Sequence, residues 1–169
     1  NRQRLAALVA EAEAIQAAAK KVPRELASWI RPNSKPFSDG LSGSALGVGD
    51  FMSSVKPLLT HSTDWFKKQT SRDIEMTLAA PAICLLCTEG DSQSDWLTTG
   101  QALQRVLLRA AWEGVQSSYC SAPLQVPSVR GRLKAFTSTL EYPQVLFYLG
   151  YPTAELKPVP RRPVEYVTE

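Results

Sequence analysis

The chain has 169 residues, of which 44% are hydrophobic and 21% charged, and its net charge is +3. This size and balance are typical of one ordinary soluble globular domain, which buries roughly 70% of the surface of its unfolded chain. The basic residues form no stripe, which argues against nucleic acid as a partner. No apolar run approaches the roughly 20 residues needed to span a membrane. The odd number of cysteines predicts free thiols and a reducing, cytoplasmic compartment.

The first third of the chain predicts two helices and a long loop. Residues 3–20 have helical spacing, and Pro23 ends this helix and opens a second one over 24–30. Residues 31–50 are rich in Gly, Pro and Ser, and a loop of this length is usually a lid, a binding loop or disorder. Its apolar side chains favour a lid. The face expected to be buried on the first helix is Leu5, Leu8, Val9, Ala12 and Ile15.

The middle of the chain predicts a strand followed by the longest helix. Residues 51–68 read as helical pieces, and 77–88 as a strand. Ser92 and Asp95 resemble a capping box at the start of a helix over about Gln93 to Gly114. Large apolar side chains on one stripe make this helix a predicted core element. The small residues on the same stripe predict close packing against a partner helix. This stripe is Trp96, Gly100, Leu103, Leu107, Ala110, Ala111 and Gly114.

The last third predicts a small-residue loop, a short helix, a buried strand and an arm. The loop covers 116–123, and the helix over 127–136 should turn Val129 and Leu133 inward and Arg130 outward. The strand over 145–149 should stop at Gly150 and Pro152, because proline cannot donate to a sheet. The arm, 152–169, is stiffened by prolines and carries Arg161 and Arg162. It is either a solvated tail or a binder of an anion such as phosphate.

These elements predict an α+β fold that is incomplete by itself. Two strands far apart in the chain are too few for an independently stable sheet. We therefore expect an upstream segment or a partner to supply further strands.

Several common chemistries are disfavoured. Cys84 and Cys87 have C-x-x-C spacing, but they fall inside an apolar strand, whereas redox pairs occupy exposed helix N-termini. The single histidine, His61, has neither a nucleophile elbow nor metal-ligand spacing around it, so no metal site is predicted. Neither dinucleotide-binding nor P-loop glycine spacing is present.

A set of motifs resembles the flavin (FMN) nitroreductase superfamily. They are the long helix with DWLTTGQALQRVLL at 95–108, LGYP at 149–152 and RRPVE at 161–165. SAPLQVP at 121–127 and the lid-like loop look most like the second half of its double-length, dormancy-associated branch. The resemblance covers most of the chain and implies a partial, C-terminal nitroreductase-like domain. It implies helices packed on a mostly antiparallel sheet, with residues 93–114 as the long central helix.

The same resemblance implies a cofactor and its contacts. FMN phosphate would meet Arg161 with Arg162 beside it, and the flavin ring would lie near Tyr119, Cys120 and Ser121. The implied activity is an NAD(P)H-dependent oxidoreductase, in which hydride passes through FMN to a nitroaromatic or quinone-type acceptor. The flavin carries the chemistry, so no catalytic side chain is expected.

The chain departs from the family at two places. It lacks the N-terminal Arg-Ser grip on the phosphate, which implies that a second nitroreductase-like half, upstream or in a dimer mate, completes the site. It also lacks the Pro-x-Glu-Gly of the flavin-facing loop, where Tyr119 to Ala122 stand instead. Two alternatives therefore stay open: a protein that sequesters FMN under its lid without turnover, and an interaction module that binds no flavin.

Overall fold

A computed structural model of the chain describes residues 1–19, 21–32, 39–42, 63–136, 140–153 and 161–168. The chain divides into two compact units, Asn1–Gln16 with Lys68–Ala154 and Ala17–Lys67 with Glu155–Glu169. In chain order the elements are α1 (Arg2–Ala18), α2 (Lys21–Trp29), β1 (Ile30–Arg31), β2 (Leu41–Ser42), α4 (Thr63–Ala79), β3 (Ala82–Thr88), α5 (Gln93–Trp112), β4 (Gln116–Tyr119), α6 (Ala122–Gln125), α7 (Pro127–Phe136), β5 (Tyr142–Gly150) and the 3-10 turn η2 (Val164–Tyr166). The described chain is therefore a mixed α+β protein.

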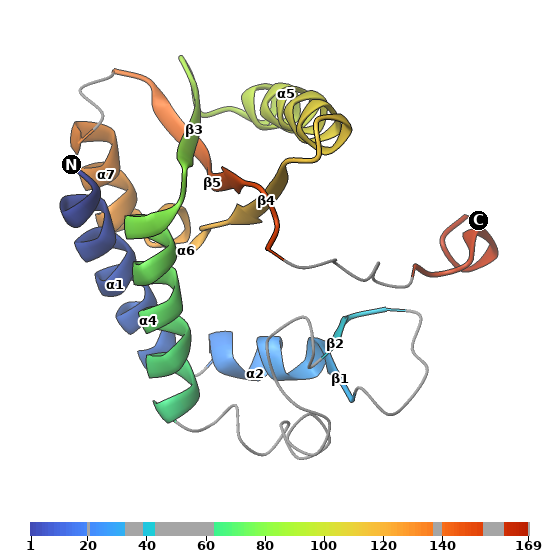
Figure 1. Cartoon of the computed structure of the whole chain (residues 1–169), viewed down its shortest axis with the longest axis horizontal. Helices are drawn as coiled ribbons and strands as arrows, with labels where there is room; N and C mark the ends of the chain where they lie inside the picture. Colours follow the sequence, from blue (N-terminus) through green and yellow to red (C-terminus); the bar gives the residue numbers. More distant parts are fainter. Residues whose placement is uncertain (20, 33–38, 43–62, 137–139, 154–160, 169) are drawn as a thin grey trace. The chain divides into compact units, whose positions relative to one another are not determined.

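The first unit is a three-stranded antiparallel sheet between helices. Its strand order is β3-β5-β4, with β5 in the centre. Helices α1, α4 and α7 lie on one side of the sheet and α5 lies on the other (Figure 1). The antiparallel sheet with packed helices confirms the predicted α+β class.

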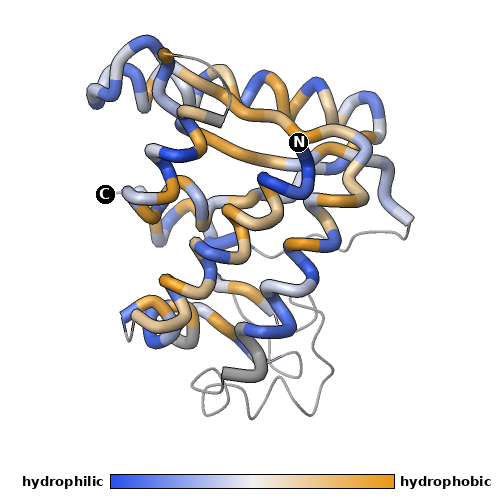
Figure 2. Tube along the Cα trace, turned by 90° about the vertical axis from the view of Figure 1, so that its left-hand side faces the viewer, coloured by the Kyte–Doolittle hydropathy of each residue, from blue (hydrophilic) through white to orange (hydrophobic). Residues whose placement is uncertain are grey.

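The core lies between the sheet and helices α1, α6 and α7. Leu146 and Tyr148 of β5 point into it, opposite Leu85 and Ile83 of β3 in the register. Phe147 lies between them in sequence and therefore faces the α5 side, where it is fully buried. In Figure 2 the start of α1 is hydrophilic, and hydrophobic residues follow along its turns. The side chains shared by this core are Leu5, Leu8, Val9, Ala12, Val126, Val129 and Leu133.

Four expectations about the helices and strands meet a different structure. Ile15 is 44% exposed, although the other four residues of its predicted face are buried. The strand predicted over 77–88 begins only at Ala82, because α4 continues to Ala79 and Pro81 then separates helix from strand. The loop predicted over 116–123 contains β4, a third strand of the same sheet, and the short helix α6. Arg130, predicted to point outward, is half-buried and bound to Asp91.

Helix α5 has the predicted ends but not the predicted burial. Ser92 and Asp95 form the capping box, with the Ser92 N–H donating to the Asp95 carboxylate at 2.9 Å. At the other end Gly114 takes φ +71 and closes a Schellman motif, in which Val115 N–H donates to the Ala110 carbonyl. Thr99 is the helix's one buried residue. The predicted core stripe is therefore wrong in part: Leu103, Leu107 and Ala110 are half-buried, and Trp96, Gly100, Ala111 and Gly114 are exposed.

The second unit contains α2, the short parallel pair β1–β2 and the end of the chain. Ile30, predicted to end a helix, pairs with Leu41, and Arg31 pairs with Ser42 inside the stretch predicted to be a loop. Gly40 takes φ +81, and a Cβ there would collide with the Trp29 carbonyl oxygen, so only glycine fits this turn. Most of the predicted lid, the helical pieces over 51–62 and residues 154–160 of the arm lie outside the described residues.

Candidate functional site

The predicted flavin-facing residues lie where β4 leaves the sheet. Tyr119 is the last residue of β4 and pairs with Phe147 of β5. The next residue remains tied to the sheet, because the Cys120 N–H donates to the Leu146 carbonyl at 2.9 Å. The Tyr119 side chain is 55% exposed and Ser121 is also exposed, whereas Cys120 is only 6% exposed. This segment therefore exposes the Tyr119 ring and the Ser121 hydroxyl, and the buried residue Cys120 lies between them in sequence.

The Cys120 side chain belongs to the core rather than to a surface site. It packs with the α1, α7 and sheet residues, and it interacts with the Tyr148 hydroxyl. Burial raises the pKa of the Cys120 thiol to about 11, so the thiol stays protonated and is a poor nucleophile at neutral pH. If Cys120 contacts a cofactor as predicted, it therefore does so as a neutral thiol or through its backbone, and not as a thiolate.

Behind Cys120 lies a polar cluster that the sequence did not indicate. The Tyr148 and Thr77 hydroxyls are 2.6 Å apart, and the Thr77 hydroxyl also donates to the Asp73 carbonyl at 2.7 Å. Burial, and then a hydrogen bond to Asp73, raise the pKa of the Glu13 carboxyl to about 8. These residues come from α1, α4 and β5. Because no local motif links such distant residues, only the folded arrangement reveals the cluster.

The remaining cysteines lie in strand β3 of the sheet. Cys84 and Cys87 are free, and burial raises the pKa of both thiols. Cys84 lies opposite Phe147, and the register shifts before Cys87, which lies opposite Pro143. Within the described part of the chain, no group of three or more His, Cys, Asp or Glu side chains is suited to holding a metal ion.

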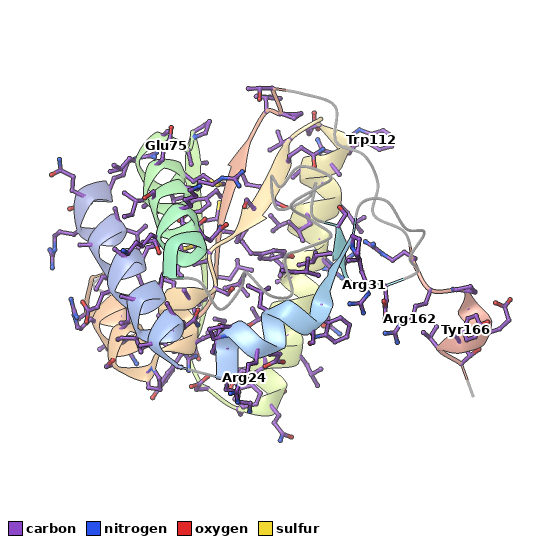
Figure 3. All side chains as sticks on the ribbon, turned by 90° about the horizontal axis from the view of Figure 1, so that it is seen from below. Arg24, Arg31, Glu75, Trp112, Arg162 and Tyr166 are labelled. Atoms are coloured by element: carbon purple, nitrogen blue, oxygen red, sulfur yellow. The ribbon has the colours of Figure 1, made fainter. Side chains whose placement is uncertain are left out.

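The arginines of the arm lie in the second unit. Arg161 is exposed, and Arg162 donates from Nη2 to Asp39 Oδ2 at 2.6 Å. Arg31 binds the other oxygen of the same carboxylate, from Nε at 3.1 Å and from Nη2 at 3.0 Å. Figure 3 labels both Arg31 and Arg162, which come from opposite ends of the chain. Hydrogen bonds from the two guanidinium groups hold the pKa of Asp39 below its usual range.

A second ionic network lies at the end of the sheet where β5 begins and β3 ends. The Asp91 carboxylate accepts two bonds from Arg130, at 2.8 and 2.9 Å, and one from the Trp96 indole at 2.8 Å. Gln144 also donates to Asp91, and to the Thr88 hydroxyl at 2.7 Å. Arg130 lowers the pKa of Asp91 more than the other donors do. The partners of Asp91 belong to α5, α7 and β5, and Gln144 extends the network to Thr88 of β3. We therefore interpret this network as structural, since it joins four elements of the first unit.

The structure brings some of the predicted site residues together and groups others separately. Tyr119, Cys120 and Ser121 form one continuous edge of the first unit, and Arg161 and Arg162 belong to the second unit. Asp39 and Arg31, which sequence reasoning missed, join Arg162. The Arg31 and Asp39 pair had one available signal, since both residues lie in the stretch 31–50 that the sequence predicts to be a lid.

No protein-family model matches the chain, and no curated protein matches it significantly. Among the described helices, none combines the length and the apolar character needed to cross a membrane.

Proposed function

We propose that the chain is part of an FMN-binding, NAD(P)H-dependent oxidoreductase of the nitroreductase type. Hydride would pass through FMN to a nitroaromatic or quinone-type acceptor. The proposal starts from the sequence resemblance, and one structural observation carries it further: Tyr119 and Ser121 are exposed around the buried anchor Cys120. An aromatic contact and a hydrogen-bonding group on a rigid support suit a flat heteroaromatic ring.

Each of the two groups of residues, taken by itself, fits one part of FMN. The exposed Tyr119 ring can make a stacked or an edge-to-face contact with the isoalloxazine ring of FMN. The Ser121 hydroxyl can donate a hydrogen bond to the polar edge of that ring or accept one from it. The Arg162 guanidinium already holds an oxyanion, the Asp39 carboxylate, so its geometry suits a phosphate oxygen as well. Arg161 is the second phosphate contact in the proposal.

The chain would contribute binding and orientation. Bound FMN supplies the hydride chemistry. The Cys120 thiol, with its raised pKa, does not exchange a proton near neutral pH, and Tyr119 and Ser121 position the ring without acting as acid or base. The strand pairing of Tyr119 and the Cys120 N–H bond to Leu146 hold both contacts in one place. Nicotinamide and acceptor would then approach the exposed side of this edge.

A partner half is part of the proposal, and α5 supports it. Trp96, Leu97, Leu108 and Trp112 are 52%, 73%, 61% and 83% exposed. Trp112 projects away from the helix (Figure 3). Exposed apolar side chains gathered on one element mark an interaction surface. A second nitroreductase-like half would cover it and would supply the phosphate contacts that this chain lacks.

The free cysteines fit a reducing compartment, so we place the protein in the cytoplasm.

Titration of FMN into the purified chain, followed by quenching of the flavin fluorescence, tests the binding part of the proposal. The Tyr119→Ala/Ser121→Ala double variant should bind FMN at least about tenfold more weakly, because it loses a ring contact and a hydrogen bond. Ser117→Ala, an exposed position on the same strand, is the matched control and should bind as the wild type does. Equal affinity of the double variant and the wild type would show that this edge does not hold the flavin.

A further inference from the structure

Two arginines share a single carboxylate in the second unit. Arg31 and Arg162 lie 131 positions apart, and each contacts a different oxygen of Asp39. Among the described residues, two positive charges therefore meet one negative charge, an excess of one positive charge in this group. A dianion would satisfy the pair better than a carboxylate does, because it balances both guanidinium charges and offers more acceptor oxygens.

Arg31 is held ready for such a ligand by the backbone around it. Its Nη1 donates to the Ser28 carbonyl at 2.6 Å, so the position of the guanidinium does not depend on Asp39 alone. The turn at Gly40 adds to this support, since a Cβ at Gly40 would lie 3.1 Å from the Arg31 Cγ. An arginine fixed in this way loses less entropy when it binds an oxyanion.

The group is also open to solutes. The side chains of Arg31 and Asp39 are each 29% exposed, and that of Arg162 is 45% exposed. Arg162 is the more exposed of the two arginines, and exposed ion pairs contribute little to stability, so an incoming anion can displace the carboxylate from Arg162 at low cost.

We propose that Arg31 and Arg162 form a phosphate site and that Asp39 is its internal competitor, which occupies the site until a phosphate dianion displaces it. For Arg162, the inference rests on the proposed function, which gives this residue a phosphate contact. The ligand is a phosphate dianion, either free or as the monoester end of FMN. Because Asp39 lies within the predicted lid-like stretch and Arg162 lies on the arm, phosphate binding would exchange the bond between Asp39 and Arg162 for a bond from Arg162 to the ligand.

Calorimetric titration of the whole chain with inorganic phosphate tests the inference. Asp39→Ala should bind phosphate about tenfold or more tightly than the wild type, because the competing charged acceptor is gone. Asp39→Asn, which keeps the shape of the side chain, should show a smaller gain in the same direction. Glu113→Ala removes a carboxylate from another exposed arginine pair, that with Arg109, and should leave phosphate affinity unchanged.

Two further variants assign the gain to the arginines. Adding Arg31→Gln or Arg162→Gln to Asp39→Ala should abolish it. The inference is overturned if Asp39→Ala and Asp39→Asn bind phosphate as the wild type does, or if the gain survives without Arg31.

Titrations with FMN and riboflavin separate the two sources of phosphate. A gain for FMN without one for riboflavin, which lacks the phosphate, assigns the site to the monoester. A gain for inorganic phosphate in a chain that binds no FMN supports the phosphate site and rejects the proposed function. Equal FMN binding by the wild type and Asp39→Ala, with no gain for phosphate, rejects the phosphate site and leaves the proposed function standing.

Discussion

The hydroxyl of Tyr148 lies 2.6 Å from the hydroxyl of Thr77, and both residues are buried. This bond joins the central strand β5 to helix α4 across 71 positions of the chain. Tyr148 also interacts with the Cys120 thiol, and burial raises the pKa of its phenol. Through Tyr148, Cys120 is therefore connected to helix α4. Cys120 lies between Tyr119 and Ser121, the two proposed flavin contacts.

Removing the Tyr148 hydroxyl should weaken the first unit. Tyr148→Phe leaves Thr77 without one of its two partners and Cys120 without its hydrogen bond. We expect a loss of about 1–2 kcal/mol in the free energy of unfolding, measured by urea denaturation. In a double-mutant cycle with Thr77→Val, the double variant should lose less than the sum of the single losses. Strict additivity would contradict a direct bond.

The raised pKa of Glu13 predicts a stability that depends on pH. In the folded chain the pKa is about 8, above the usual 4.5, so the folded state holds a proton that the unfolded state releases. The stabilisation from this proton is complete below pH 4.5 and is lost as the pH rises toward 8. Glu13→Gln resembles the protonated acid and should therefore become increasingly more stable than the wild type over this range.

The expected advantage of Glu13→Gln at pH 8 is on the order of 1–2 kcal/mol, after allowance for the solvent that reaches this half-buried group. Urea denaturation at several pH values measures it. Glu11→Gln, on the same helix but in an exposed pair with Arg132, is the matched control for the substitution itself. A constant difference between Glu13→Gln and the wild type from pH 5 to pH 8 would exclude a raised pKa of Glu13 in the folded chain.

The bond between Arg130 and Asp91 should contribute more than an ordinary surface ion pair. Arg130 makes two bonds to Asp91 and one each to the Pro143 carbonyl and Gln144. Arg130→Gln should therefore lower the free energy of unfolding by about 1–3 kcal/mol. Arg132→Gln, two positions along the same helix, breaks only an exposed pair and should cost about 0.5 kcal/mol or less. Similar losses for the two variants would show that Arg130 contributes no more than an exposed ion pair does.

The exposed side of α5 predicts self-association. Leu97 and Leu108 lie on the same side of the helix, and both are exposed. Introducing Leu97→Glu and Leu108→Glu together should weaken the dimer at least about tenfold, with little change in the unfolding of the monomer. Sedimentation measures the association, and Thr98→Glu, exposed elsewhere on α5, is the control. A wild-type chain that stays monomeric at all concentrations would contradict the dimer.

The local elements were predictable because their signals are local. Ser92 and Asp95 predict the capping box of α5, and Gly114 predicts the end of this helix. Gly150 predicts the end of β5. Val129 and Leu133 are buried as the helical period of α7 required. In each case the residue that decides the structure lies within one or two turns of the element it bounds.

What failed depends on contacts between distant residues. β4 is made of Gln, Ser, Ser and Tyr, which have little apolar character, and it becomes a strand because it pairs with β5. The burial of α5 was overestimated because an apolar stripe does not reveal how much sheet is available to cover it. Asp39, which also binds Arg31, binds Arg162 across 123 positions, which no spacing rule anticipates. The flavin contacts remain predictions from the resemblance.

An absorbance spectrum of the whole chain with bound FMN, recorded before and after NADPH is added without oxygen, tests the central claim most directly. The proposed oxidoreductase should carry the yellow flavin band, and NADPH should bleach it. A band that NADPH leaves unchanged would contradict the oxidoreductase and indicate a flavin-sequestering protein. A chain that remains colourless after incubation with FMN would contradict flavin binding altogether.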